Sequence, residues 1–511
     1  MSSRPDLTRR EALSGLSAAG ALPVLPAALA TAPRRGGRIR VASISSSSAD
    51  TLDPAKGALS TDYVRHFMLY SGLTQFSDGL TPRLALAEAF ETSDRVRWSI
   101  RLRKGVEFHD GSPLTAADVV YSLLRHKTPA LGSKVKTIAD QILEARVTGP
   151  QALEIRLSGP NADLPAILAT SHFVIIKDGA HDFRTANGTG PYRLRAFNPG
   201  VRTIVSRNPN YWKPGRPYLD EIELIGIPDE VSRVNALLSG DVHLVNAINP
   251  RSTRRIAASH RHGIIETRSG LYTDMILRQD RAPTGDPNFV LAMKHLFDRE
   301  LICKALYRGY ATVANDQPIP PGHPYYFPGL PQRTHDPDRA RFLLKKAGLL
   351  NLRLPVYASP AADGSVDMAS ILQEQAGQIG LRLAVNRVPS DGYWSNHWMK
   401  HPLTFGNTNP RPTADLLFSL FYKSDAAWNE SGWKSDRFDQ LLLAARGEAD
   451  EARRKQMYAE MQILVHDKGG VVIPVFISSL DAFDRRLKGF RSIATGGLMG
   501  YAFAEYVWLE G

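Results

Sequence analysis

Residues 87–126, AEAFETSDRVRWSIRLRKGVEFHDGSPLTAADVVYSLLRH, decide the fold of this chain. The apolar residues of RWSIRL (97–102) alternate with polar ones, which predicts a half-buried strand. The glycines that follow permit two turns. Thr115, with Asp118 three residues later, predicts the start of a helix, whose apolar face is formed by Val119, Val120, Leu123 and Leu124. We expect a hairpin followed by a capped helix, without the residues of a reaction centre.

Part of this stretch, RLRKGVEFHDGSPLTAADVVYSL (101–123), closely resembles the signature of the family 5 extracytoplasmic solute-binding proteins. These proteins are the peptide, dipeptide, nickel and opine receptors of ABC importers. The signature is specific because its short elements occur together at the family's spacing, and in the family it lies away from the ligand. Further segments that match the family are GTGPY (188–192), NPNYW (208–212), ALLSGDVHLV (236–245) and DRE (298–300).

The resemblance implies an α/β fold with two lobes, the periplasmic-binding-protein fold of type II, cluster C, with an extra accessory subdomain in the first lobe. We expect residues 31–270 to form lobe I, including the accessory subdomain at about 82–185. Residues 271–485 are expected to form lobe II, and residues 486–511 to return to lobe I. The chain length of 511 residues agrees with two or three domains.

The N-terminal segment has the features of an export signal. TRREAL (8–13) resembles a twin-arginine motif, and the moderately apolar residues 13–30 end in the small-x-small pattern ALA. Glycines and prolines interrupt this apolar region, which makes it a poor transmembrane helix. We expect residues 1–30 to be a signal peptide and the mature protein to be soluble in the periplasm. A disordered cytoplasmic tail is the alternative interpretation.

Composition excludes several classes of function. The net charge is +12, but the basic residues are scattered and accompany no recognition motif, so nucleic-acid binding is not expected. A basic protein that captures anionic or zwitterionic solutes fits better. Cys303 is the only cysteine, which excludes an intrachain disulfide and a site of several thiolates. We expect a monomer without cofactor or resident metal.

No catalytic motif is present in the sequence. It contains no Gly-x-Ser-x-Gly, His-Glu-x-x-His or Walker sequence, and His260 and His262 are better explained as a surface pair. The resemblance therefore implies a binding protein, not an enzyme, which captures an oligopeptide or dipeptide in the interlobe cleft and delivers it to a membrane permease. Alternatives are an opine-like amino-acid conjugate that bears a carboxylate and, third, a nickel chelate. The competing class is a secreted hydrolase.

Tryptophans are concentrated in residues 393–433, which contain Trp394, Trp398, Trp428 and Trp433, four of the seven in the chain. Aromatic side chains offer large rigid faces with a polar group, and so suit a cleft that closes over a solute. We expect at least two of these tryptophans to line the site. The serines at 45–48 follow a predicted strand; they either face the cleft or form a surface turn.

The segment TNPRPTAD (408–415) predicts the chemistry of the ligand. In peptide-binding members of the family, an aspartate before a proline pairs with the ligand's α-amino group; here Arg411 precedes Pro412, and Asp415 could still serve as that anchor. A buried lone guanidinium is costly, so Arg411 is either exposed or matched to an anion such as a carboxylate. The predicted ligand-binding residues are Ser46, Ser47, Trp394, Trp398, Asn409, Arg411, Asp415 and Trp428.

Overall fold

The computed structural model describes residues 32–44 and 47–510. The compact unit that contains both lobes begins at Arg34. The predicted signal peptide at residues 1–30 and the predicted ligand contact Ser46 lie outside the described residues. Within them, no helix combines the length and the apolar character needed to cross a membrane.

A ten-stranded sheet forms the frame of the molecule. Its strand order is β16-β12-β18-β11-β1-β10-β9-β8, with β13 paired to β18 and β17 paired to β12. The strands are β1 (Arg38–Ser43), β8 (Tyr192–Asn198), β9 (Arg202–Arg207), β10 (Glu221–Gly226), β11 (Leu244–Val245), β12 (His262–Leu277), β13 (Ala311–Val313), β16 (Leu403–Thr408), β17 (Val471–Val472) and β18 (Val475–Asp484).

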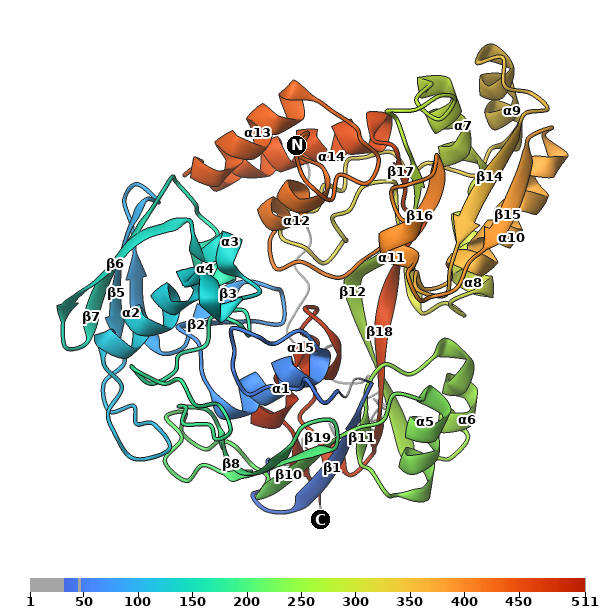
Figure 1. The fold of residues 1–511 in the computed structure, drawn as a ribbon. Coiled ribbons are helices and arrows are strands. Elements are labelled where there is room, and N and C mark those ends of the chain that lie inside the picture. Colours follow the sequence, from blue (N-terminus) through green and yellow to red (C-terminus); the bar gives the residue numbers. More distant parts are fainter. Residues whose placement is uncertain (1–31, 45–46, 511) are drawn as a thin grey trace, which may run out of the picture. The chain divides into compact units, whose positions relative to one another are not determined.

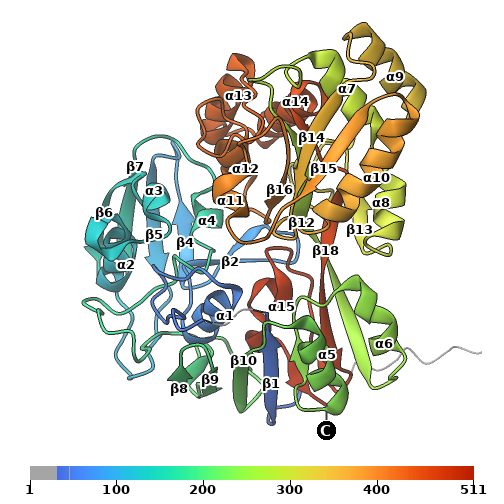
Figure 2. The ribbon, with the colours of Figure 1, turned by 45° about the vertical axis from the view of Figure 1, so that its right-hand side comes forward.

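Two long antiparallel strands, β12 and β18, connect the two halves of this sheet (Figures 1 and 2). Their pairing runs from His262 opposite Asp484 to Thr267 opposite Ser479, shifts register, and resumes at Leu271 opposite Ile477. On one side of the shift β18 pairs with β11, and on the other β12 pairs with β16. We refer to the part around β1 as lobe I and the part around β16 as lobe II.

Lobe I packs its share of the sheet against α1 (Ser60–Leu69), α5 (Glu230–Ser239), α6 (Thr253–Ala257) and α15 (Gly497–Gly500). The small strands β2 (Thr74–Phe76), β3 (Pro82–Leu84), β19 (Leu487–Lys488) and β20 (Trp508–Leu509) complete it. The core includes Ile39, Val41, Leu69, Tyr192 and, from the C-terminal segment, Phe503. Residues 487–509, which we call the C-terminal segment, are therefore part of lobe I's core.

A separate four-stranded sheet with order β4-β5-β7-β6 forms what we call the accessory subdomain (Figure 1). Its elements are β4 (Ala87–Glu91), β5 (Arg97–Leu102), β6 (Ile142–Gly149), β7 (Ala152–Leu157), α2 (Ala116–Leu124), α3 (Lys136–Ala139) and α4 (Leu164–Ile167). Alternate residues of β5 are buried, and the Thr115 backbone N–H donates to Asp118 Oδ2 at 2.8 Å at the start of α2. These contacts confirm the predicted strand and the predicted helix start.

Lobe II contains a parallel pair, β14 (Arg353–Ala358) and β15 (Arg382–Arg387), and most of the helices. The helices are α7 (Pro287–Leu296), α8 (Arg299–Ala305), α9 (Pro337–Lys346), α10 (Ser365–Gln378), α11 (Tyr393–Asn396), α12 (Ala414–Phe421), α13 (Asp436–Gly447) and α14 (Glu451–Lys468). Asp298 caps α8 by accepting from the Leu301 N–H, and Arg299 donates to the buried Asp316 at 2.7 Å.

The accessory subdomain touches lobe II directly through the segment before α4. Arg454 of α14 forms an ion pair of 2.7 Å with Asp163, and both side chains are buried. The Ala162 N–H donates to the Arg446 carbonyl oxygen at 2.9 Å. Arg454 also donates to the Tyr325 hydroxyl group, so its guanidinium is held from two sides. This contact joins the two lobes at a point distant in sequence from β12 and β18.

We predict that Arg454→Met lowers the free energy of unfolding by about 3 kcal/mol or more, because it leaves Asp163 buried without its partner. Asp163→Asn combined with Arg454→Met should recover part of this loss, and the double-mutant cycle isolates the pair from the other bonds of Arg454. Urea denaturation measures the free energy of unfolding of the single and the double variants. The matched control is Arg437→Met, which removes the exposed pair of Arg437 with Glu460 and should change the free energy of unfolding very little, because water screens an exposed pair. Equal losses for Arg454→Met and Arg437→Met would contradict the prediction.

Candidate functional site

A cavity of about 1050 Å³ is lined by both lobes and by the C-terminal segment. Lobe I contributes Tyr63 and Phe67 of α1, lobe II contributes residues 409–412 and Trp428, and the C-terminal segment contributes residues 500–502. Ser269 and Ser479, from β12 and β18, also line it. This volume is at the upper end of the range for small-molecule sites and has room for a solute of several residues.

Aromatic rings form much of the cavity wall. Tyr63 and Tyr501 meet edge to face with ring centroids 5.4 Å apart, and Trp428 lies 5.7 Å from Phe421. Trp428 is 44% exposed, although it is one of the largest side chains of the wall. Exposed aromatic surface in a cavity is free to contact a solute, so this wall favours ligands with apolar side chains.

A turn of left-handed backbone places Tyr501 in the wall. Leu498, Met499, Gly500 and Tyr501 all have positive φ angles between 53° and 72°. Such backbone costs about 1 kcal/mol or more for each residue other than glycine. Asp481 of β18 holds the turn by accepting from the Leu498 N–H at 2.6 Å. Leu498 and Met499 are buried in the core of lobe I, so packing and this hydrogen bond offset the strain.

Arg411 brings a positive charge into the cavity without a partner. Its Nε is buried and has no hydrogen-bond partner, and the side chain forms no ion pair with any described residue. Its guanidinium carbon lies 5.6 Å from the Phe421 ring centroid. Burial lowers the pKa of Arg411, while nearby tyrosines, Tyr63 and Tyr501 among them, act in the opposite direction. A guanidinium in this state is suited to binding an anion.

Glu505 is the acidic residue of the cavity wall, and it is already paired. It accepts from Lys213 at 2.6 Å and from Arg216 at 3.1 Å. The Tyr211 hydroxyl group donates to it at 3.3 Å. Burial lowers the pKa of Lys213, and Glu505 opposes that shift. The carboxylate of Glu505 therefore stabilises the wall and has little capacity left for a positively charged ligand group.

The predicted ligand contacts fall into two groups. Asn409, Arg411 and Trp428 line the cavity, whereas Trp394, Trp398, Asp415 and Ser47 are not among the residues that line it. Asp415 is buried and accepts from Arg446 at 2.7 Å. The Ser47 hydroxyl group accepts from the Ala49 N–H. Trp394 packs edge to face on Tyr393 and Trp398. Their assignment as ligand contacts stays a prediction.

Sequence reasoning missed Tyr63, His172, Tyr501 and Glu505, which line the cavity from segments far apart in the chain. None of these segments carries a local pattern that distinguishes a cavity residue from a packed one. One available signal was the segment GGLMGYAF (496–503), because glycines beside an aromatic residue allow unusual backbone.

Trp398 is part of a buried acidic cluster in lobe II. Its indole N–H donates to Glu430 Oε1 at 2.7 Å. Glu430 interacts with Asp274 of β12, and neither oxygen of Asp274 accepts a hydrogen bond from another described group. Gly406 lies opposite Asp274 in the β12–β16 pair, and a Cβ atom there would lie 2.5 Å from Glu430 Oε1. Two buried carboxyl groups can hydrogen-bond to each other only if one of them keeps its proton.

Burial raises the pKa of Asp274 to about 7, and burial together with Asp274 raises the pKa of Glu430. A carboxyl group whose pKa is raised in the folded state stabilises the protein below its unfolded pKa, and this stability is lost as the pH rises through about 7. We predict that Asp274→Asn flattens the fall in the free energy of unfolding between pH 5 and pH 8, by at most about 3 kcal/mol, because the loss extends only to a pH of about 7. Urea denaturation across this range measures it. Asp338→Asn, on the exposed start of α9, should keep the wild-type slope, and equal slopes for Asp274→Asn and wild type would refute the prediction.

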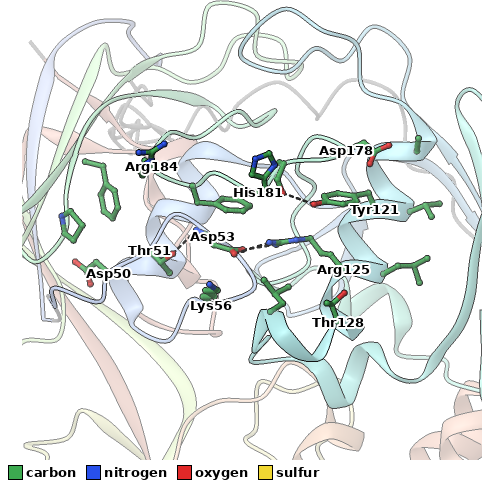
Figure 3. Close-up of a pocket in the computed structure, with 18 of the residues that line it drawn as sticks. Asp50, Thr51, Asp53, Lys56, Tyr121, Arg125, Thr128, Asp178, His181 and Arg184 are labelled. Atoms are coloured by element: carbon green, nitrogen blue, oxygen red, sulfur yellow. Dashed lines mark hydrogen bonds and ion pairs between the residues drawn. The ribbon is translucent and has the colours of Figure 1, made fainter.

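A second cavity, of about 1060 Å³, lies between lobe I and the accessory subdomain (Figure 3). Its central charged groups are paired with one another: Arg125 donates to both carboxylate oxygens of Asp53, at 2.8 and 3.0 Å. The Tyr121 hydroxyl group donates to the Ala180 carbonyl oxygen at 2.8 Å. Arg184 at the rim pairs with Asp182. Because these groups already have partners, the first cavity is the better candidate for a ligand site.

Comparisons with known proteins bear on the family and the fold of this chain. Residues 80–429 match the family model described as bacterial extracellular solute-binding proteins, family 5. The chain is 24% identical over 464 residues to the dipeptide-binding protein of Escherichia coli strain K12, covering 83% of this chain and 86% of that protein. It is 25% identical over 499 residues to the glutathione-binding protein GsiB of Escherichia coli O6:K15:H31, covering 93% and 96%. These matches confirm the family resemblance of residues 101–123.

The fold is similar to that of a solved structure, the periplasmic binding protein DppA from Helicobacter pylori in complex with the peptide STSA. The TM-score is 0.78 at 23% sequence identity, and the likeness covers 94% of this chain and 99% of that one. This likeness concerns the fold and confirms the predicted α/β periplasmic-binding-protein fold.

Proposed function

This chain belongs to the family 5 bacterial extracellular solute-binding proteins, and we propose that its solute is a short peptide held in the cavity between Tyr63, Arg411 and Trp428. Its relatives are solute-binding proteins, among them a dipeptide-binding and a glutathione-binding protein. Like them it is a receptor of an ABC importer and not an enzyme. The family membership is shown by the comparisons, and the identity of the solute as a peptide is our proposal.

The observation that carries the proposal is the cavity wall, which is made by both lobes. A solute that contacts Tyr63 of lobe I and Trp428 of lobe II interacts more strongly with the lobes together than with either lobe alone. Its differential affinity therefore shifts the protein toward the closed arrangement. A membrane permease can then distinguish the loaded receptor by its conformation, without any covalent step.

The cellular setting belongs to the same proposal. Members of this family act outside the cytoplasm, and the twin-arginine resemblance of residues 8–13 supports export with removal of residues 1–30. We propose that the mature protein works as a monomer in the periplasm with a permease as its partner. The scattered basic residues give no support to a nucleic-acid partner.

The second candidate solute is an opine-like amino-acid conjugate, favoured by the unpaired guanidinium of Arg411. Such a conjugate carries a carboxylate on an N-carboxyalkyl group. A nickel chelate has less support, because His172 is the one histidine among the described residues of the wall. No group of three potential metal ligands occurs among the residues that the structure describes.

We predict that Trp428→Ala weakens peptide binding by about tenfold or more, because the side chain contributes exposed aromatic surface to the cavity. A thermal-shift screen of the mature protein against di- and tripeptide pools identifies a ligand, and isothermal titration calorimetry then measures its Kd in each variant. Phe342→Ala is the matched control, since Phe342 of α9 is an exposed aromatic side chain (56%) that does not line the cavity. It should leave the affinity unchanged. Equal affinities of the two variants would refute the proposed site, and turnover of the bound peptide would refute the receptor function.

A further inference from the structure

The charges of the cavity wall are unbalanced. Among the described residues of the wall, the charged side chains are Lys134, Lys213, Arg411 and Glu505. Glu505 neutralises Lys213 and also pairs with Arg216 behind it. Lys134 is exposed. One half-buried cation, Arg411, therefore has no counterion among the described residues, and no carboxylate of the wall is free.

Acidic residues near the cavity are also committed to other partners. Asp62, next to Tyr63, pairs with Arg65 at 2.8 Å. Asp415, four residues after Arg411, pairs with Arg446. Asp481 accepts from the N–H groups of Leu498 and Ala247. None of the three is among the residues that line the cavity, so none is placed to receive a ligand ammonium group.

These two observations have opposite consequences for the two ends of a peptide. The guanidinium of Arg411 is half-buried, and its Nε has lost its hydration without gaining a partner; a ligand carboxylate can replace this lost interaction with a charge-assisted, bidentate contact. An α-ammonium group entering the same cavity would be desolvated and would find no counterion there. An N-acylated amine carries no charge, and the secondary ammonium group of an N-carboxyalkyl amino acid has two carboxylates of its own molecule beside it, so both lose less on entry than a free α-ammonium group.

We infer that this site selects its ligand by a carboxylate bound to Arg411 and does not require a free α-amino group. This rests on the proposed function of the cavity and narrows its substrate class to acidic solutes, such as N-blocked peptides and N-carboxyalkyl amino acids. Arg411 is then the residue that determines specificity.

The inference is tested with five probe pools: a tripeptide library in free, N-acetylated, C-amidated and doubly blocked form, and a set of N-(1-carboxyethyl) amino acids. Each pool is equilibrated with the mature protein, separated by gel filtration, and quantified by mass spectrometry. Wild type should retain the N-acetylated pool at least as well as the free pool. It should retain the amidated and doubly blocked pools at least about tenfold less. Arg411→Gln should remove the difference in retention between the acid pools and the amide pools, and Arg411→Lys should keep part of this difference. Arg341→Gln, at an exposed position on α9, should behave as wild type.

A second measurement needs no ligand. If Arg411 lacks a counterion, Arg411→Met should leave the thermal midpoint of the ligand-free protein equal to or above that of wild type, because a partly desolvated charge without a partner does not stabilise the folded state. A lower midpoint would show that Arg411 is paired in the free protein and would overturn the inference.

The outcomes separate the two levels of the proposal. Equal retention of acid and amide pools by wild type overturns the role of the carboxylate and leaves the receptor function intact. Retention that depends on a free amino group likewise overturns the inference and leaves the receptor function intact. Failure of wild type to retain any of the five pools overturns both the peptide proposal and the inference.

Discussion

The antiparallel pairing of β12 with β18 is the constraint on which the rest of this structure depends. These two strands are members of one sheet, yet their two ends belong to different lobes. The register shift between Thr267 and Leu271 interrupts the ladder at the place where the sheet changes lobe. Because Ser269 and Ser479 near this shift line the cavity, the connection between the lobes is also the floor of the site.

Buried charged groups in the structural parts of this protein have ionic partners, whereas the charged group proposed to bind the ligand has none. Asp316 is fully buried between Arg299 and Arg333, whose guanidinium groups lower its pKa to about 2. Asp163 with Arg454 and Glu505 with Lys213 follow the same rule. Burying such groups is tolerated only when each has a partner with good geometry. Arg411 departs from this rule, because its buried Nε has no partner inside the cavity. This makes it the candidate group for binding an anionic ligand.

Sequence patterns predicted local structure and family well, and the composition of the site less well. The alternation in residues 97–102 and the Thr115–Asp118 contact depend only on neighbours in the chain, so they could be predicted. Arg411 was predicted because it stands where peptide-binding relatives carry an aspartate before a proline, and Trp428 because it belongs to a cluster of tryptophans. Both line the cavity, and their contact with a ligand stays a prediction. Trp398 has the same local signal, but its indole N–H is used by Glu430. Tyr501 reaches the cavity through left-handed backbone stabilised by Asp481, and such tertiary support cannot be deduced from local sequence.

The contact of the accessory subdomain with α14 limits how freely this protein can exchange parts with its relatives. The subdomain has its own sheet and core, which makes it look like a module that could be transplanted as a unit. Asp163 and Arg454, however, lie on opposite sides of such a graft. A chimera that receives a foreign subdomain without an acid at this position would leave a guanidinium of lobe II stranded, so the two segments must be inherited or engineered together.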